Sequence, residues 1–120
     1  MKNNSIASMS LRDQRLQLVV VNILLDECYG LKHYPGQKFL SNGEKTLQWE
    51  NALDSVNTKM ISYSYVLIMM NLRGGYEVLN ATADAMRDQG EGIDKAIQLL
   101  DAYKKRIEAT AEELNAELAE

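Results

Sequence analysis

The chain has 120 residues and a formal net charge of −4, with 46% hydrophobic and 25% charged residues. This balance is typical of one soluble globular domain, and it excludes both intrinsic disorder and a fibrous or linker-rich chain. Residues 1–60 carry seven basic and six acidic groups, net +1, whereas residues 61–120 carry six basic and eleven acidic groups, net −5. Because no excess of positive charge is clustered on this acidic chain, we expect no nucleic-acid binding.

The N-terminal and apolar segments predict a cytoplasmic protein. The polar residues 1–9 lack the apolar stretch of a signal peptide, and we expect them to form a flexible N-terminus of the single domain 1–120. The longest apolar run, residues 65–70, is far shorter than the roughly 20 residues that cross a membrane. The single cysteine, Cys28, excludes an internal disulfide, and we expect it to be a small buried hydrophobe.

The first predicted helix covers residues 10–28. Ser10 is a suitable N-cap, and Gly30 is available for a left-handed C-terminal cap. Apolar residues occupy more than one face of this helix and leave a narrow polar line of Arg12, Arg15, Asn22 and Asp26. Since a helix that is apolar on most sides must be covered on several sides, we expect it at the centre of the fold.

The second predicted helix covers residues 42–72 and carries the most regular pattern. Ser41 and Glu44 have the spacing of a capping box at its start. Apolar residues then recur at alternating intervals of four and three, at Trp49, Leu53, Val56, Met60, Tyr63, Leu67 and Met70. This spacing is typical of a helix that packs along its length against another helix. The alternation of residues 61–65 also fits a strand, but the helical spacing passes through it without a change of phase.

Two further helices are predicted at residues 76–89 and 92–118, with Arg73-Gly74-Gly75 and Gly90-Glu91-Gly92 as the breaks before them. A helix as long as the second, roughly 43 Å at 1.5 Å per residue, does not fit into a compact globule roughly 35 Å across. The predicted fold is therefore all-α, an elongated four-helix antiparallel bundle with two long helices.

The second helix also carries apolar residues away from its regular spacing, namely Ile61, Tyr65, Val66, Ile68, Met69 and Leu72. A lone bundle would leave some of them in water, as a patch typical of an interface. We therefore expect the bundle to be completed by dimerisation, most simply as a two-fold homodimer. The interface candidates are Trp49, Tyr65, Ile68, Met69 and Leu72. In the alternative, the other three helices cover all of these residues within one chain.

The loop of residues 29–39 gathers basic and aromatic residues around a Pro35-Gly36 turn. Its lysines could contact phosphate or carboxylate, and its rings could stack or donate hydrogen bonds. The ligand-binding candidates are Lys32, His33, Tyr34, Lys38, Arg73 and Tyr76. The last two belong to the opposite end of the bundle, so only a head-to-tail dimer would bring them close to the loop. In the other interpretation, the aromatic residues close the bundle end as a structural plug.

Catalytic chemistry has little support in the sequence. The chain has no Glu-x-x-His pair for a metal in a bundle, no glycine-framed serine and no phosphate-binding glycine loop. We predict no enzymatic activity, no metal and no cofactor. The first hypothesis is a non-enzymatic interaction protein that binds or sequesters a macromolecular partner, such as an inhibitor, immunity or accessory protein of bacteria or phages. The alternative is a binder of a small anion, a nucleotide or phosphate, that uses the loop from Lys32 to Lys38.

Overall fold

The computed structural model describes residues 10–87 and 92–119, with side chains as far as Thr110. The predicted flexible segment 1–9 and the predicted break at residues 90–91 lie outside this description. The four helices are α1 (Leu11–Lys32), α2 (Leu47–Met69), α3 (Arg73–Met86) and α4 (Gly92–Ala119).

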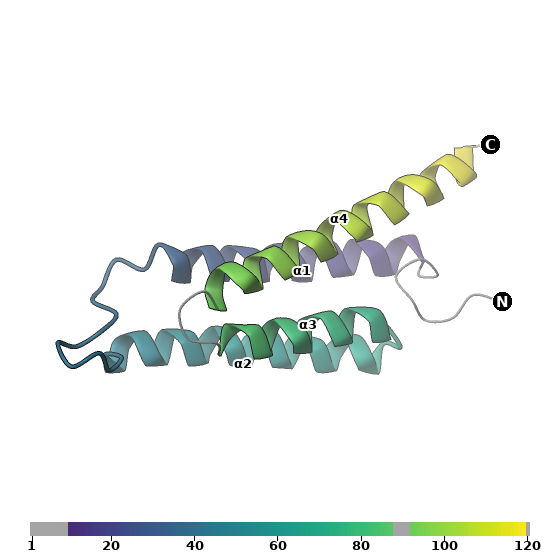
Figure 1. Ribbon diagram of the computed structural model, residues 1–120. Coiled ribbons are helices and arrows are strands. Elements are labelled where there is room, and N and C mark those ends of the chain that lie inside the picture. Colours follow the sequence, from purple (N-terminus) through teal and green to yellow (C-terminus); the bar gives the residue numbers. More distant parts are fainter. Residues whose placement is uncertain (1–9, 88–91, 120) are drawn as a thin grey trace.

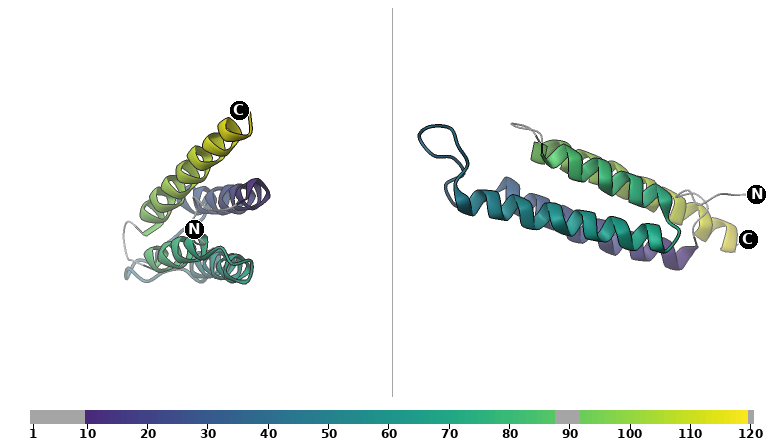
Figure 2. Two further views of the ribbon diagram at one scale, coloured as in Figure 1. Left: turned by 90° about the vertical axis from the view of Figure 1, so that its right-hand side faces the viewer. Right: turned by 90° about the horizontal axis from the view of Figure 1, so that it is seen from below.

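The helices form an up-down-up-down bundle in which each helix runs antiparallel to the next (Figure 1). Viewed end-on, α1 and α2 lie on one side of the bundle and α3 and α4 on the other (Figure 2). Helix α1 packs mainly against α4, and α2 packs mainly against α3, whereas contact between α1 and α2 is thin. The bundle extends 62 × 24 × 17 Å. The predicted elongated four-helix antiparallel bundle is therefore confirmed, and the strand interpretation of residues 61–65 is wrong, because they lie within α2.

Helix α1 continues beyond its predicted end. Gly30 lies inside the helix, which ends at Lys32 with His33 as the C-cap. The additional turn places Leu31 in the core, and burial of a leucine side chain is worth about 1.5–3 kcal/mol. This gain outweighs the modest cost of a glycine in a helix, so the predicted left-handed cap at Gly30 is wrong.

Helix α2 begins five residues later than predicted. The Thr46 hydroxyl accepts a hydrogen bond from the backbone N–H of Trp49 at 3.2 Å, so Thr46 is the N-cap. Ser41 and Glu44 belong to the preceding loop, and the predicted capping box is wrong. At its other end α2 stops at Met69, before the predicted residue 72, and Asn71 turns the chain with a positive φ of 66°.

The Arg73-Gly74-Gly75 segment forms the first turn of α3 and is not a break before it. Helix α3 therefore covers residues 73–86 in place of the predicted 76–89. Gly75 lies against side chains of the other three helices: a Cβ there would be 2.5 Å from Tyr103 Oη, 2.7 Å from Gln17 Oε1 and 2.8 Å from Leu67 Cδ1. Because the position has no room for a side chain, this glycine permits close packing of α3.

The core follows the predicted spacing on α2. Its buried members are Trp49, Val56, Met60 and Leu67, while Leu53 and Tyr63 are partly buried and Met70 is exposed at the helix end. On α4, Tyr103 is 1% exposed and fills the core beside Lys104, as predicted. Its hydroxyl donates a hydrogen bond to Gln17 Oε1, and Gln17 is fully buried on α1.

Helix α1 occupies a corner of the bundle. Its predicted polar line is confirmed, since Arg12, Arg15, Asn22 and Asp26 are all exposed. Val19 and Ile23 are exposed as well. Within one chain α1 is therefore not the central helix, because the other helices leave this apolar strip of α1 open to solvent.

Candidate functional site

The connection between α1 and α2 folds into a short hairpin over residues 38–46, called the 38–46 hairpin below. An antiparallel bridge joins Phe39 to Lys45. Gly43 closes the turn with a φ of 86°, in the left-handed region that glycine enters at little cost. Its backbone N–H donates to the carbonyl of Leu40 at 2.9 Å. The 38–46 hairpin is therefore held by hydrogen bonds, and it projects beyond the end of the bundle (Figure 1).

Trp49, in the first turn of α2, joins the 38–46 hairpin to the bundle. Its ring is buried, the Tyr34 ring lies 5.1 Å from it between centroids, and Lys38 Nζ lies 4.7 Å from its centroid. The Thr46 hydroxyl, which caps α2, also donates to the carbonyl of Gln37 at 2.8 Å. Tyr34 and Trp49 thus close the bundle end as a plug, and the Lys38 ammonium makes a cation–π contact.

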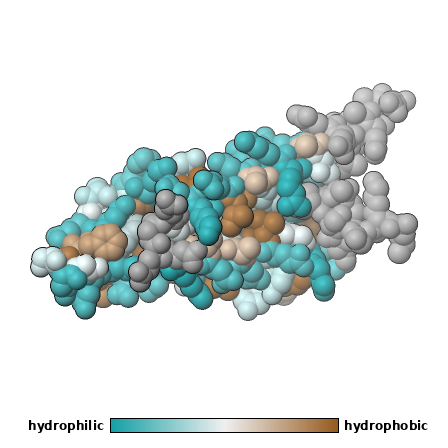
Figure 3. All heavy atoms as spheres, viewed as in Figure 1, coloured by the Kyte–Doolittle hydropathy of each residue, from teal (hydrophilic) through white to brown (hydrophobic). Residues whose placement is uncertain are grey.

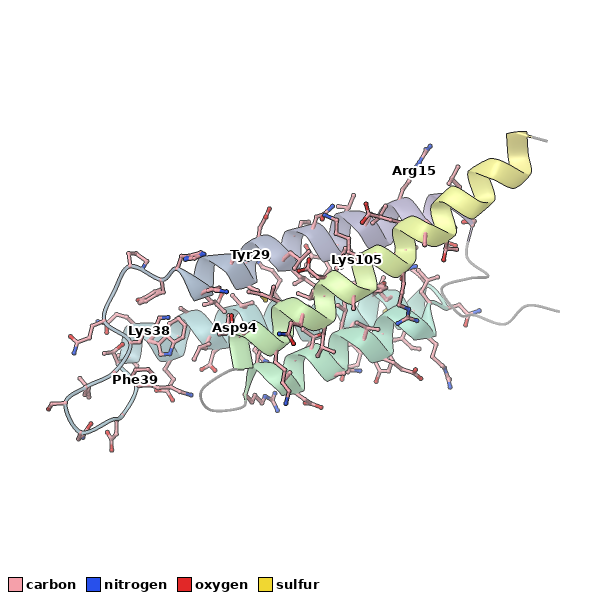
Figure 4. All side chains as sticks on the ribbon, turned by 45° about the horizontal axis from the view of Figure 1, so that its top comes forward. Arg15, Tyr29, Lys38, Phe39, Asp94 and Lys105 are labelled. Atoms are coloured by element: carbon pink, nitrogen blue, oxygen red, sulfur yellow. The ribbon has the colours of Figure 1, made fainter. Side chains whose placement is uncertain are left out.

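Large apolar side chains at this end remain in solvent. Phe39 is 52% exposed, Leu47 is 68% exposed, and Leu40, which follows Phe39 in the sequence, is also exposed. Figure 4 shows Phe39 on the projecting loop, and hydrophobic atoms are visible at the same end of the molecule in Figure 3. Because exposed apolar residues are gathered on an ordered loop and not scattered singly, this end has the character of a contact surface.

A pocket of about 730 Å³ lies between the 38–46 hairpin and the beginning of α4. Its apolar lining comes from Phe39, Trp49, Leu53, Met86 and Ile93. Its charged lining comes from two lysines and two glutamates, Lys38, Lys45, Glu44 and Glu50. Since these charges balance, the pocket has no excess of positive charge for a phosphate, and its apolar residues could contact an apolar side chain.

The predicted ligand-binding residues do not form one cluster. Lys32 Nζ lies 3.0 Å from Asp94 Oδ1 in an ion pair, and His33 is the exposed C-cap of α1. Arg73 and Tyr76 begin α3 at the opposite end of the bundle, where the Tyr76 ring lies near that of Tyr65. Within one chain, the structure therefore brings Lys32, Tyr34 and Lys38 to the hairpin end of the bundle. Arg73 and Tyr76 lie at the other end, away from them.

The predicted interface residues separate into two groups. Met69 is 84% exposed, Tyr65 is exposed and Ile68 is partly buried. Trp49 and Leu72 are buried in the core of the chain, at 5% and 6% exposure, and their place at an interface stays a prediction. Sequence reasoning named Val66 as an apolar residue off the regular spacing, but it missed that Val19 and Ile23 of α1 are exposed.

The shifted titratable groups indicate structural roles. Burial, with a smaller effect of the Glu27 charge, raises the pKa of the Cys28 thiol to about 11. Burial also raises the pKa of the Tyr103 hydroxyl. Protonated, buried groups of this kind are poor nucleophiles. Among the described residues, no three His, Cys, Asp or Glu side chains are close enough to hold a metal ion.

None of the described helices is long and apolar enough to cross a membrane. In comparisons with known proteins, no family model, curated protein or solved structure matches this chain.

Proposed function

We propose that this chain is a non-enzymatic helical protein that binds a protein partner through the 38–46 hairpin. The observation that carries the proposal is the exposure of Phe39 and Leu40 on a loop fixed by hydrogen bonds, and of Leu47 at the beginning of α2 directly after that loop. Burial of such side chains by a partner would yield about 1.5–3 kcal/mol each when complete. Because the loop is already ordered, little conformational entropy would be lost on binding.

The partner's contact site is apolar in this proposal. The pocket beside the 38–46 hairpin has balanced charge, and the chain as a whole carries −4, so a protein segment suits it better than a nucleic acid. An apolar side chain of the partner would enter the pocket between Phe39 and Ile93. By binding its partner in this way, the chain would sequester it and act as an inhibitor, immunity or accessory protein of the cytoplasm. The exposed Tyr65, Val66 and Met69 support self-association as a homodimer in addition.

The anionic-ligand alternative has less support. Lys32 is paired with Asp94, and Lys38 lies over the Trp49 ring. A phosphate would have to displace one of these contacts. Thermal shift against nucleotides and inorganic phosphate tests this alternative. Stabilisation that disappears in a Lys32→Ala, Lys38→Ala variant would favour it over protein binding.

Capture experiments with matched variants test the main proposal. Host lysate is passed over the immobilised wild type and over a Phe39→Ser, Leu47→Ser variant. The control is Leu99→Ser, which changes an exposed leucine on α4. We expect a defined protein to be retained by the wild type and by Leu99→Ser, and lost with the hairpin variant. Equal retention by all three proteins, or no specific retention by the wild type, would contradict the proposal.

A further inference from the structure

Four exposed apolar side chains, two on α1 and two on α2, lie at nearly one level of the bundle. The Lys59 Nζ to Glu27 Oε1 ion pair, at 2.5 Å, fixes the register of these antiparallel helices. Counting back from Glu27 along α1 and forward from Lys59 along α2 therefore places Val19 and Ile23 level with residues 63–67. Val66 lies within this level, Met69 lies two residues beyond it, and all four side chains are exposed. The surface that Val19, Ile23, Val66 and Met69 form is called the α1–α2 face.

Charged residues flank this apolar level on α1 with opposite signs. Arg15 is six residues before position 21, the midpoint of Val19 and Ile23, and Glu27 is six residues after it. At 1.5 Å per residue, each lies about 9 Å from the midpoint. Arg15 is exposed and extends away from the bundle near the beginning of α1 (Figure 4). Glu27 already pairs with Lys59, and Asp26, five residues after position 21, is exposed beside it. The order along this side of the helix is therefore basic, apolar, acidic, with Arg15 and Asp26 at nearly equal distances from the midpoint.

A shallow groove lies at the acidic end of this face. It has a volume of about 400 Å³ and runs between α1 and α2, where their contact is thin. Small residues form part of its lining, and two carboxylate residues stand beside them: Gly30, Ala52, Ser55, Asp26 and Glu27. Gly30 is nine residues after position 21, and Arg12 is nine residues before it. The same helix thus carries an acidic groove and an arginine at matching distances from its apolar centre.

We propose that a second copy of this chain packs antiparallel on the α1–α2 face, about a two-fold axis at the level of Val19 and Ile23. A surface ordered basic, apolar, acidic is complementary to itself after a rotation of 180°. Each Arg15 then faces Asp26 of the other copy, and each Arg12 reaches the groove beside Gly30. This arrangement gives a geometry to the proposed homodimer and does not involve the 38–46 hairpin.

Apolar contact at the axis is tested by light scattering and sedimentation velocity. Ile23 and Leu99 are both 36% exposed, so Ile23→Glu on α1 and Leu99→Glu on α4 form a matched pair. We expect a dimer mass for the wild type and for Leu99→Glu, and a monomer mass with unchanged helical circular dichroism for Ile23→Glu. A monomeric wild type at the highest soluble concentration, or a dimer unaffected by Ile23→Glu, would overturn the proposal.

Charge exchange tests the antiparallel register itself. Arg15→Glu and Asp26→Arg should each weaken self-association, because each places like charges across the axis. When the two variants are mixed, every pair across the axis is complementary again, and the mixed dimer should form at least about ten-fold more tightly than either variant alone. A mixture without this preference would show that the register is wrong. Capture of a partner by monomeric Ile23→Glu would show that hairpin binding is independent of dimerisation.

Discussion

The replacement of Gly75 by alanine tests the packing of all four helices at once. A Cβ at this position of α3 would lie 2.5 Å from Tyr103 Oη on α4, 2.7 Å from Gln17 Oε1 on α1 and 2.8 Å from Leu67 Cδ1 on α2. Each of these atoms ends a side chain, but all three side chains are buried. Tyr103 and Gln17 are also joined by a hydrogen bond. None can therefore move without disturbing the core.

The expected loss of stability follows from opposing contributions. An added methyl group in a packed core costs about 1–3 kcal/mol, and separation of the Tyr103–Gln17 hydrogen bond costs about 1–3 kcal/mol. The higher helix propensity of alanine returns at most about 1 kcal/mol. The net loss of about 3 kcal/mol would lower the Tm of a chain of this length by about 9–15 °C.

Thermal and urea denaturation, followed by far-ultraviolet circular dichroism, measure this loss. Gly30→Ala is the control, because Gly30 is also helical but a Cβ there meets nothing within 4 Å. We expect Gly30→Ala to raise stability by about 0.5–1 kcal/mol. In a Tyr103→Phe background, which removes the nearest atom, Gly75→Ala should cost less than in the wild type. Equal stabilities of Gly75→Ala and Gly30→Ala would refute the close four-helix contact.

Two further predictions concern the α2 cap and alkaline pH. Thr46→Ala should lower the free energy of unfolding by about 1–2 kcal/mol, whereas Ser41→Ala should change it by less than about 0.5 kcal/mol. Urea titrations measure both changes. Equal effects of the two substitutions would contradict the assignment of Thr46, and not Ser41, as the N-cap. The pKa of Cys28 is raised from 9.0 to about 11 in the folded chain, and burial raises that of Tyr103 too. Above about pH 9 the unfolded chain loses a proton from Cys28 that the folded chain keeps, so stability should fall by about 1.4 kcal/mol per pH unit. Cys28→Ala should reduce the slope of Tm against pH in this range, and an unchanged slope would contradict buried protonation of the thiol.

The sequence predicted those features that depend on the local period of one helix. The spacing from Trp49 to Leu67 places successive side chains on one face of α2, whatever neighbour covers that face. Burial along this helix therefore agreed with the prediction. The same reasoning predicted that Tyr103 would fill the core beside Lys104. Lys104 interrupts the apolar spacing of α4, and an aromatic ring one position away can occupy the space that an apolar side chain would fill there.

Helix ends could not be predicted in this way, because competing local signals differ by little free energy. Ser41 and Thr46 are both good N-caps, and the choice between them depends on the bridge between Phe39 and Lys45 in the 38–46 hairpin. Gly30 is a good C-cap, but the burial of Leu31 extends the helix past it. Tertiary contacts decided each case.

The candidate sites were predicted less well, because they depend on which helices become neighbours. Hydrophobicity alone did not show that Val19 would face solvent, since exposure follows from the corner position of α1. The burial of Gln17 was not predicted, because its hydrogen-bond partner in the core, Tyr103, is 86 positions away in the sequence. The sequence did identify the region around Tyr34 and Lys38, although both residues contact Trp49 within the chain.

The two proposed surfaces together predict the stoichiometry of a complex. The last residue of α1, Lys32, is eleven positions from the proposed axis, or about 16 Å at 1.5 Å per residue, and the 38–46 hairpin lies beyond it. A two-fold axis therefore places the two hairpins more than about 30 Å apart, at opposite ends of the dimer. One small partner molecule cannot cover both, so the wild type should bind two partner molecules per dimer, and monomeric Ile23→Glu should bind one. The mass of the purified complex by light scattering measures this ratio, and one partner molecule per wild-type dimer would contradict the antiparallel arrangement.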